Sequence, residues 1–264
     1  MPKVSVIMGV YNVGDKYYLE QAIKSILKQS FTDFEFIICD DGSIDNTYII
    51  IQKLIKDDRR CILIRNKVNQ GLAKTLNNCI SIAKGEYIAR MDADDISLEN
   101  RLFKQVEYLD LHPEVAVLGT QAYFIDKNGK RFKEFKRKKI ISLMDTVKNS
   151  NLIHPTVMIR KNILLEVNGY STGKLTTRAE DYDLWCKIAF NNYEIENLDL
   201  FLFEYREDIN AYKKRKYKHR VEEYQLKKYW IKKCSAKKKY LLYAYKPLLV
   251  GLIPSSLMIR RKIR

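Results

Sequence analysis

The first hundred residues alternate between short apolar segments and segments with helical periodicity, and this alternation constrains the fold more than any other feature. Apolar segments that predict buried strands occur at residues 4–8, 34–39, 61–64 and 87–91. Between them, apolar side chains recur every three or four positions, as in Leu19, Ile23 and Ile26, which predicts helices. Strands that alternate with helices form βαβ units. We therefore predict an α/β fold with a mostly parallel, Rossmann-like central sheet flanked by helices.

The pattern is looser in the second hundred residues. Further elements are predicted as helices at 102–111 and 181–190 and strands at 115–125 and 156–159. The Asp-Lys-Asn-Gly sequence at 126–129 has the composition of a hairpin turn. Residues 131–151 are basic and poorly patterned, so we predict an irregular excursion or mobile loop there.

Polar residues follow three of the four predicted N-terminal strands. Tyr11 comes after the first strand, Asp40 and Asp41 after the second, and an Asp-Ala-Asp-Asp run at 92–95 after the fourth. Ligands of such sheets bind beyond the carboxyl ends of the strands, where these residues converge. Two carboxylates separated by one residue suit Mg²⁺ or Mn²⁺, which are often shared with a diphosphate. These carboxylates are therefore a candidate metal site at this edge of the sheet.

Each motif also has a purely structural role when it is taken alone. Acidic strand ends serve as solvated turns and helix caps, and Asp95 suits a cap for a helix that starts near Ser97. The Asp40-Asp41 pair can form a turn with an N-cap. Glu180-Asp181 places negative charge at a helix start, which the helix dipole favours. Only the combination of motifs favours a functional site.

Four blocks of sequence together resemble family 2 glycosyltransferases of the GT-A fold. In chain order they are MPKVSVIMGVYN, QSFTDFEFIICDDGSIDNT, NQGLAKTLNNCISIAKGEYIARMDADDISLENRL and RAEDYDLWCKI. The resemblance covers roughly residues 1–210. It implies a glycosyltransferase domain at 1–211, with a nucleotide-sugar-binding half at 1–100 and an acceptor-binding half at 101–211.

The resemblance implies that the first half binds a nucleotide base. Tyr11 would lie against a uracil ring, and Asp41 would accept a hydrogen bond from its imide nitrogen. Asp40 would shape the same pocket.

The resemblance also implies a diphosphate and metal site. Asp94 would hold Mn²⁺ or Mg²⁺ against the diphosphate, and Asp92 would contact the ribose or the metal. The segment at 69–72 matches a family loop that borders the sugar nucleotide. Lys74 and Arg90 are therefore candidate phosphate or sugar contacts.

On the acceptor side, the resemblance assigns the catalytic base to Asp181. His154, Glu180 and Trp185 are candidate acceptor or diphosphate contacts, although His154 can be structural and Trp185 can simply pack. The Gln-x-x-Arg-Trp motif and the multiple membrane-spanning helices of processive synthases do not occur in this sequence. The resemblance therefore favours an inverting, metal-dependent transferase that moves one sugar from a UDP-sugar.

The net charge of +16 is confined to the C-terminal fifth of the chain. Residues 212–264 hold 18 Lys and Arg against 2 acidic residues, whereas residues 1–211 hold 30 of each sign. Aromatic and leucine side chains are interleaved with these cations, as interfacial membrane segments require. We predict that 212–264 is a basic, amphipathic helical extension that contacts an anionic membrane surface.

Two alternative roles for this extension stay open. It can be a solvated helical hairpin that packs on the domain, or it can bind nucleic acid through cations and aromatics. The neutral first 211 residues disfavour a nucleic-acid-binding protein. For the chain as a whole, a non-catalytic nucleotide-sugar-binding domain is a further alternative, which the intact Asp92, Asp94 and Asp181 disfavour.

The five cysteines are odd in number and form no CxxC pair, which favours buried thiols in a reducing compartment over a disulfide framework or a zinc site. The N-terminus has no signal-peptide pattern, and no run of 18 uncharged apolar residues occurs. We expect a cytoplasmic protein, peripheral on the inner face of the cell membrane. Its expected acceptor is a saccharide, such as one linked to undecaprenyl diphosphate, in capsule, O-antigen or exopolysaccharide synthesis.

Overall fold

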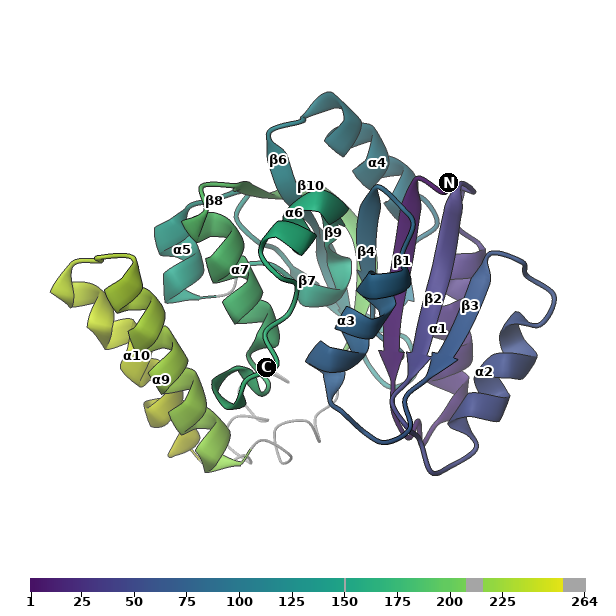
Figure 1. Cartoon of the computed structure of the whole chain (residues 1–264), viewed down its shortest axis with the longest axis horizontal. Coiled ribbons are helices and arrows are strands. Elements are labelled where there is room, and N and C mark those ends of the chain that lie inside the picture. The colour runs from purple at the N-terminus through teal and green to yellow at the C-terminus, as the bar shows by residue number, and fades with distance from the viewer. Residues whose placement is uncertain (150, 208–215, 254–264) are drawn as a thin grey trace.

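A computed structural model describes residues 1–149, 151–207 and 216–253, which fold around one mixed sheet with helices on both faces (Figure 1). Within these residues the sheet has ten strands, and its main path is β3-β2-β1-β4-β9-β6-β10-β5. β7 pairs with β6, and β8 pairs with β10.

The N-terminal half of the sheet is parallel, as predicted. Its strands are β1 (Val4–Val10), β2 (Phe34–Asp40), β3 (Cys61–Arg65) and β4 (Tyr87–Met91). The crossover helices are α1 (Lys16–Leu27), α2 (Thr47–Ile55) and α3 (Leu72–Ile82). Each strand and helix falls where the sequence periodicity predicts it. Their parallel register brings the carboxyl ends of β1, β2 and β4 to one edge.

Side chains of β1 alternate between two hydrophobic layers, because successive residues of a strand face opposite sides of the sheet. Val6 and Met8 pack with Leu19 of α1 on one face. Ile7 packs with Leu76 of α3 on the other face. The helices thus cover both faces of the sheet, as the predicted α/β fold requires.

The second half of the sheet mixes directions. Its longer strands are β6 (Val115–Ile125) and β10 (Glu194–Arg206), which run parallel to each other. Its short strands β5 (Ile96–Ser97) and β9 (Met158–Arg160) are antiparallel to their neighbours. The helices of this half are α4 (Arg101–Leu111), α6 (Lys161–Glu166) and α7 (Glu180–Phe190).

The prediction of an irregular loop at 131–151 is wrong. Apart from residue 150, which lies outside the described residues, this stretch holds β7 (Arg131–Phe135), β8 (Ile140–Ile141) and α5 (Leu143–Lys148). β7 is mostly exposed and charged, so it lacks the apolar alternation of a half-buried strand. α5 is short and begins with a capping box formed by Ser142 and Asp145. The turn predicted at 126–129 is confirmed, since β6 and β7 pair antiparallel around it.

The C-terminal extension forms a helical hairpin of α9 (Tyr217–Lys233) and α10 (Leu241–Gly251), which lies at the opposite end of the molecule from α2 and β3 (Figure 1). Leu226, Trp230 and Ile231 of α9 pack with residues of α5 and α7 in a third hydrophobic cluster. The predicted boundary between 211 and 212 lies outside the described residues, as do the basic clusters at 213–215 and 260–264. One face of the hairpin therefore packs on the domain.

Two polar contacts fix the position of α9. The Trp230 indole Nε1 donates a hydrogen bond of 2.8 Å to Asp183 Oδ1 in α7. Lys227 Nζ donates to the Lys148 carbonyl oxygen at the C-terminal end of α5, at 3.0 Å, and lies over the Tyr182 ring. Both of these α9 side chains are buried, so the hairpin is an integral layer of the described structure.

None of the five cysteines forms a disulfide, which agrees with the predicted thiols. In the described parts of the chain, every helix is too short or too polar to span a bilayer.

We predict that Trp230→Phe lowers the free energy of unfolding by about 1–3 kcal/mol, because it leaves a buried Asp183 oxygen without its donor. Urea denaturation measures this change. The control is Tyr229→Phe, which alters a half-exposed neighbour and should change stability by less than about 0.5 kcal/mol. Wild-type stability in Trp230→Phe would contradict the proposed anchoring contact.

Candidate active site

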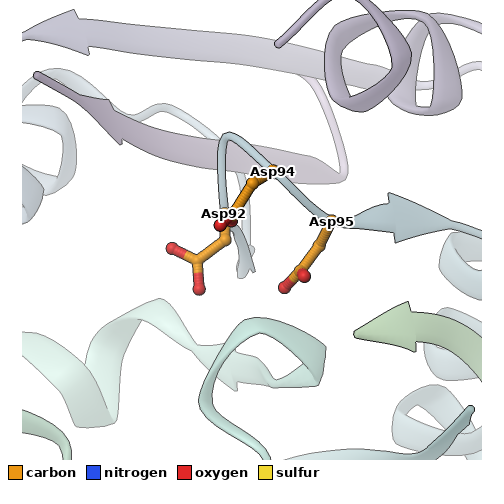
Figure 2. A group of neighbouring side chains, drawn as sticks. All are labelled: Asp92, Asp94 and Asp95. Carbon is orange, nitrogen blue, oxygen red and sulfur yellow. The ribbon is translucent and has the colours of Figure 1, made fainter. Parts of the chain in front are cut away.

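An acidic turn leaves the buried strand β4. The side chains of Asp92, Asp94 and Asp95 gather on one side of this turn (Figure 2), and each offers a carboxylate oxygen within 4.8 Å of the other two. Arg90, buried at the end of β4, forms an ion pair with Asp92. Three clustered carboxylates are the oxygen-rich donor set that Mg²⁺ and Mn²⁺ prefer.

Asp95 has a different role from the predicted helix cap. Its Oδ1 accepts a hydrogen bond of 2.7 Å from the backbone N–H of Arg206, while α4 begins only at Arg101, after Asn100. Its Oδ2 is buried and has no hydrogen-bond partner among the described residues. Burial and the neighbouring carboxylates raise the pKa of Asp95 well above its ordinary value. An orphaned, buried carboxylate oxygen in an acidic cluster fits a site for a cation.

Asp95 is a candidate metal ligand that sequence reasoning missed, although the Asp-Ala-Asp-Asp run contained the signal. Asp94 shares its electrostatic environment. The pKa of Asp94 is raised to about 6. The causes are desolvation of its carboxyl group by the surrounding protein atoms and the charge of Asp92, although part of the side chain is exposed to solvent. A divalent cation would relieve this repulsion, so the three residues fit the predicted metal.

Arg206, the last residue of β10, holds the acidic turn in place. Its Nε donates to the Asp94 carbonyl oxygen, at 2.8 Å, and its two terminal nitrogens donate to the Asp126 carbonyl and to Gln21 Oε1. The guanidinium also stacks on Tyr18, at 4.2 Å from the ring centroid. The turn is therefore tied to α1 and to the β6–β7 hairpin.

Asp41 organises the loop that leads into α3. Its carboxylate accepts hydrogen bonds from Asn66 Nδ2 at 2.7 Å, Gln70 N at 2.9 Å and Gly71 N at 2.8 Å. Gly42 has φ = 71°, and a Cβ there would lie 2.6 Å from the backbone of Val68. Glycine thus allows the loop to pack closely on the turn after β2. The predicted contact of Asp41 with a base stays a prediction.

Asp40 and Tyr11 differ sharply in exposure. Asp40 is fully buried, and its Oδ2 lies 3.0 Å from Arg65 Nε. The Asp40 side chain therefore supports the structure around the loop that leads into α3, and it does not face solvent. Tyr11 follows β1 directly, and 46% of its side chain is exposed. Its ring is accessible to a planar ligand, and next to it Asn12 Oδ1 accepts a hydrogen bond from Ile44 N at 2.9 Å.

A cavity of about 450 Å³ joins the two halves of the domain. Its lining includes the predicted Asp92, Glu180 and Asp181, with Arg90 and His154 between them. Further lining residues are Leu72, Phe135, Arg137, Leu152, Ile153, Pro155, Arg178 and Tyr205. The cavity brings residues of β4 together with the N-terminal end of α7, as the predicted donor and acceptor roles require.

A second cavity of similar size adjoins the first. Lys74 lines it together with the segments 70–73 and 171–173, and Glu180 lines both cavities. Among the described residues, the linings of these two cavities do not include Tyr11, Asp40 or Asp41, which belong to the β1 and β2 ends of the sheet edge.

The Glu180-Asp181 pair occupies the first turn of α7, where the helix dipole favours negative charge. Burial and the charge of Asp181 raise the pKa of Glu180 to about 7. Asp181 Oδ1 accepts a hydrogen bond of 2.7 Å from the Tyr182 backbone N–H. A carboxyl group whose pKa is raised by burial and by a neighbouring charge, at the edge of a cavity, is typical of a functional site.

His154 is held by the protein and stays neutral. Its Nε2 lies 2.8 Å from the Tyr170 hydroxyl, and burial together with the charge of Arg90 lowers its pKa well below the ordinary value. Trp185 lies beneath it, with the two rings edge to face, and only 1% of Trp185 is exposed. Of the two roles considered for Trp185, packing is therefore the one that its position supports.

Comparisons with known proteins agree with this arrangement. The sequence model of the family described as glycosyl transferase family 2 matches residues 5–167. EpsE of Bacillus subtilis (strain 168), a protein named as a glycosyltransferase, is 35% identical over 263 residues, covering 98% of this chain and 92% of EpsE. The Escherichia coli protein WfaP is 30% identical over 217 residues, with 82% of each chain covered. WfaP is named as a UDP-Glc:alpha-D-GlcNAc-diphosphoundecaprenol beta-1,3-glucosyltransferase.

Solved structures share the fold. S. aureus TarS 1-349 in complex with UDP-GlcNAc matches with a TM-score of 0.70 at 22% identity, covering 95% of this chain and 71% of that chain. Against a longer TarS chain, the match spans 43% of that chain's length. The mixed sheet with acids at its carboxyl edge has the GT-A fold of these structures. The chain belongs to glycosyl transferase family 2.

We predict that Glu180→Gln changes how stability depends on pH. In the unfolded chain this carboxyl group ionises near its ordinary value of 4.5, whereas in the folded protein it ionises near 7. The wild type should therefore lose stability, relative to Glu180→Gln, as the pH rises from 4.5 to 7, by at most about 3 kcal/mol.

Urea denaturation of both proteins at pH 5, 6, 7 and 8 measures this difference. The exposed Glu99→Gln serves as the control for the loss of a surface carboxyl group. A constant difference between wild type and Glu180→Gln would contradict the raised pKa.

Proposed function

We propose that this family 2 glycosyltransferase moves one sugar from a UDP-sugar to an acceptor hydroxyl with inversion of the anomeric configuration. The observation that carries the proposal is the cavity in which Asp92, at the acidic turn, and Asp181, at the start of α7, share one lining. A donor whose diphosphate lies at the turn would present its sugar to the base. The resemblance to WfaP, named as acting on UDP-Glc, supports the choice of nucleotide.

In this mechanism Asp181 accepts the proton of the acceptor hydroxyl while that oxygen attacks the anomeric carbon. Burial and the charge of Asp181 raise the pKa of Glu180 to about 7, so Glu180 adds negative charge beside Asp181 only when the pH exceeds this value. Attack from the face opposite the diphosphate converts an α-linked donor into a β-linkage. When bound by Asp92, Asp94 and Asp95, Mn²⁺ or Mg²⁺ would neutralise charge on the departing nucleoside diphosphate.

The acceptor that we propose is a saccharide carried on a lipid diphosphate, such as undecaprenyl diphosphate. WfaP, which shares 82% of its length with this chain, is named for such an acceptor. Assembly of an exopolysaccharide, capsule or O-antigen is the corresponding process.

We further propose that the extension at 212–264 holds the enzyme on the inner, anionic face of the cell membrane. On α10, the side chains of Leu242, Tyr245 and Leu249 recur at helical spacing and are all exposed, and Leu252 follows just beyond the helix. Lysines 237–239 precede α10 and Lys246 lies within it. Apolar side chains with surrounding cations favour an anionic bilayer surface.

We expect Asp94→Asn to weaken Mn²⁺-dependent UDP binding at least tenfold, because the metal loses one of its three carboxylates. Asp181→Asn should bind UDP like the wild type but lose sugar transfer by roughly 10²–10⁴-fold, since it cannot take the proton. Calorimetry with UDP and Mn²⁺, and a panel of UDP- and dTDP-sugars in a transfer assay, measure both effects. The exposed Asp57→Asn is the control. Normal transfer by Asp181→Asn would overturn the assigned base.

Membrane attachment is tested with liposomes that contain anionic lipid. The double variant Leu242→Gln, Leu249→Gln should float with these liposomes several-fold less than the wild type, with unchanged UDP binding. Leu111→Gln is a matched control, because Leu111 and Leu242 are both 74% exposed and Leu111 lies in α4. Flotation that is equal in all three proteins would contradict docking through α10. Salt-sensitive DNA or RNA binding without sugar transfer would favour the nucleic-acid alternative.

A further inference from the structure

Arg137, in the connection between β7 and β8, lines the cavity that holds Asp92 and Asp181. Three arginines contribute to this lining, and one of them, Arg90, is paired with Asp92. In the part of the chain that the structure describes, no carboxylate pairs with Arg137, and its Nε is buried without a hydrogen-bond partner.

Contacts of both its backbone and its side chain fix the position of Arg137. Its backbone N–H donates to Gln121 Oε1 at 2.6 Å, and Gln121 Nε2 donates to the Arg137 carbonyl oxygen at 3.0 Å. Gln121 is a buried residue of β6. The guanidinium stacks on Phe135, at 4.1 Å from the ring centroid. A side chain held in this way loses little conformational entropy when it binds a ligand.

Among the described residues, no anion compensates the charge of Arg137. Burial lowers its pKa, and no acid of the described ranges counters this effect. Removing a guanidinium from water without a partner is unfavourable, so an anion that enters the cavity gains a charge-assisted hydrogen bond at little further desolvation cost. The planar guanidinium matches the oxygens of a phosphate group in particular.

We propose that Arg137 is a substrate-binding residue that contacts a diphosphate group in this cavity. The proposal rests on the proposed function, which supplies two sources of that group. One is the nucleoside diphosphate of the donor, and the other is the lipid diphosphate of the acceptor. Both sources present the same diphosphate group. Replacing Arg137 would weaken UDP binding in the first case and binding of the lipid-linked acceptor in the second.

The test compares the wild type with Arg137→Ala, Arg137→Gln, Arg137→Lys and the control Lys136→Ala. Lys136 is the exposed neighbour of Arg137, and its Nζ lies 2.9 Å from Glu134. Calorimetry measures UDP affinity in the presence of Mn²⁺. Steady-state kinetics then compares two acceptors with the same sugar, one linked to a lipid diphosphate and one linked to an uncharged alkyl chain.

If Arg137 contacts the donor, Arg137→Ala should weaken UDP binding at least tenfold and slow transfer to both acceptors alike. If it contacts the acceptor, UDP affinity stays unchanged and only the diphosphate-linked acceptor shows a KM raised at least tenfold. Arg137→Lys should restore part of either loss, because it keeps the charge. Arg137→Gln provides the same comparison if the alanine variant does not fold.

Wild-type behaviour of Arg137→Ala or Arg137→Gln in every arm, or equal losses in Lys136→Ala, would overturn the proposal. A third experiment tests the Arg137 site independently of the proposed function. If no sugar nucleotide and acceptor pair is turned over, calorimetry with inorganic pyrophosphate still tests Arg137. Pyrophosphate that binds wild type at least tenfold more tightly than Arg137→Ala would support the site, and equal affinities would reject it.

Discussion

The hydrogen bonds of Arg206 connect the two halves of the sheet at the active site. The backbone N–H of Arg206 binds the Asp95 carboxylate, and its guanidinium binds the Asp94 carbonyl. Since Arg206 ends β10, the position of the acidic turn depends on the register of the second half of the sheet. The turn in its observed position shares a cavity with the start of α7, and the proposed mechanism of transfer requires that proximity.

Local periodicity and the motif resemblance predicted the elements that carry the proposed donor-binding residues. They did not predict features that depend on contacts between residues far apart in the sequence. The strands β1 to β4 and the helices α1 to α4 follow from apolar runs and apolar spacing, because β1, β2 and β4 are buried and each of these helices buries one face. The two-residue strand β5 was not predicted. The hydrogen bond that holds Asp95 could not be foreseen, since its partner Arg206 is 111 residues away. The β7 strand was missed because an exposed edge strand has no apolar pattern to detect.

The active site contains charges of both signs that the described protein leaves uncompensated. A buried oxygen of Asp95 and the Nε of Arg137 both lack hydrogen-bond partners. Cations would be attracted to the acidic turn, and anions to the β7–β8 connection. A metal-bound diphosphate carries both charges in one ligand, so the proposed substrate would satisfy buried groups that otherwise lower stability.

The contact between Trp230 and Asp183 has a consequence for selectivity. Asp183 lies two residues after Asp181 on α7, and its other carboxylate oxygen accepts a hydrogen bond from Ser171, at 2.6 Å. Because α9 is hydrogen-bonded to α7, which carries the proposed base, a hairpin that binds a bilayer would present that helix at a fixed angle to the lipid surface. Lipid-anchored saccharides would then enter in one orientation, so the hydroxyl that is glycosylated would be chosen by geometry as well as by contacts with the sugar.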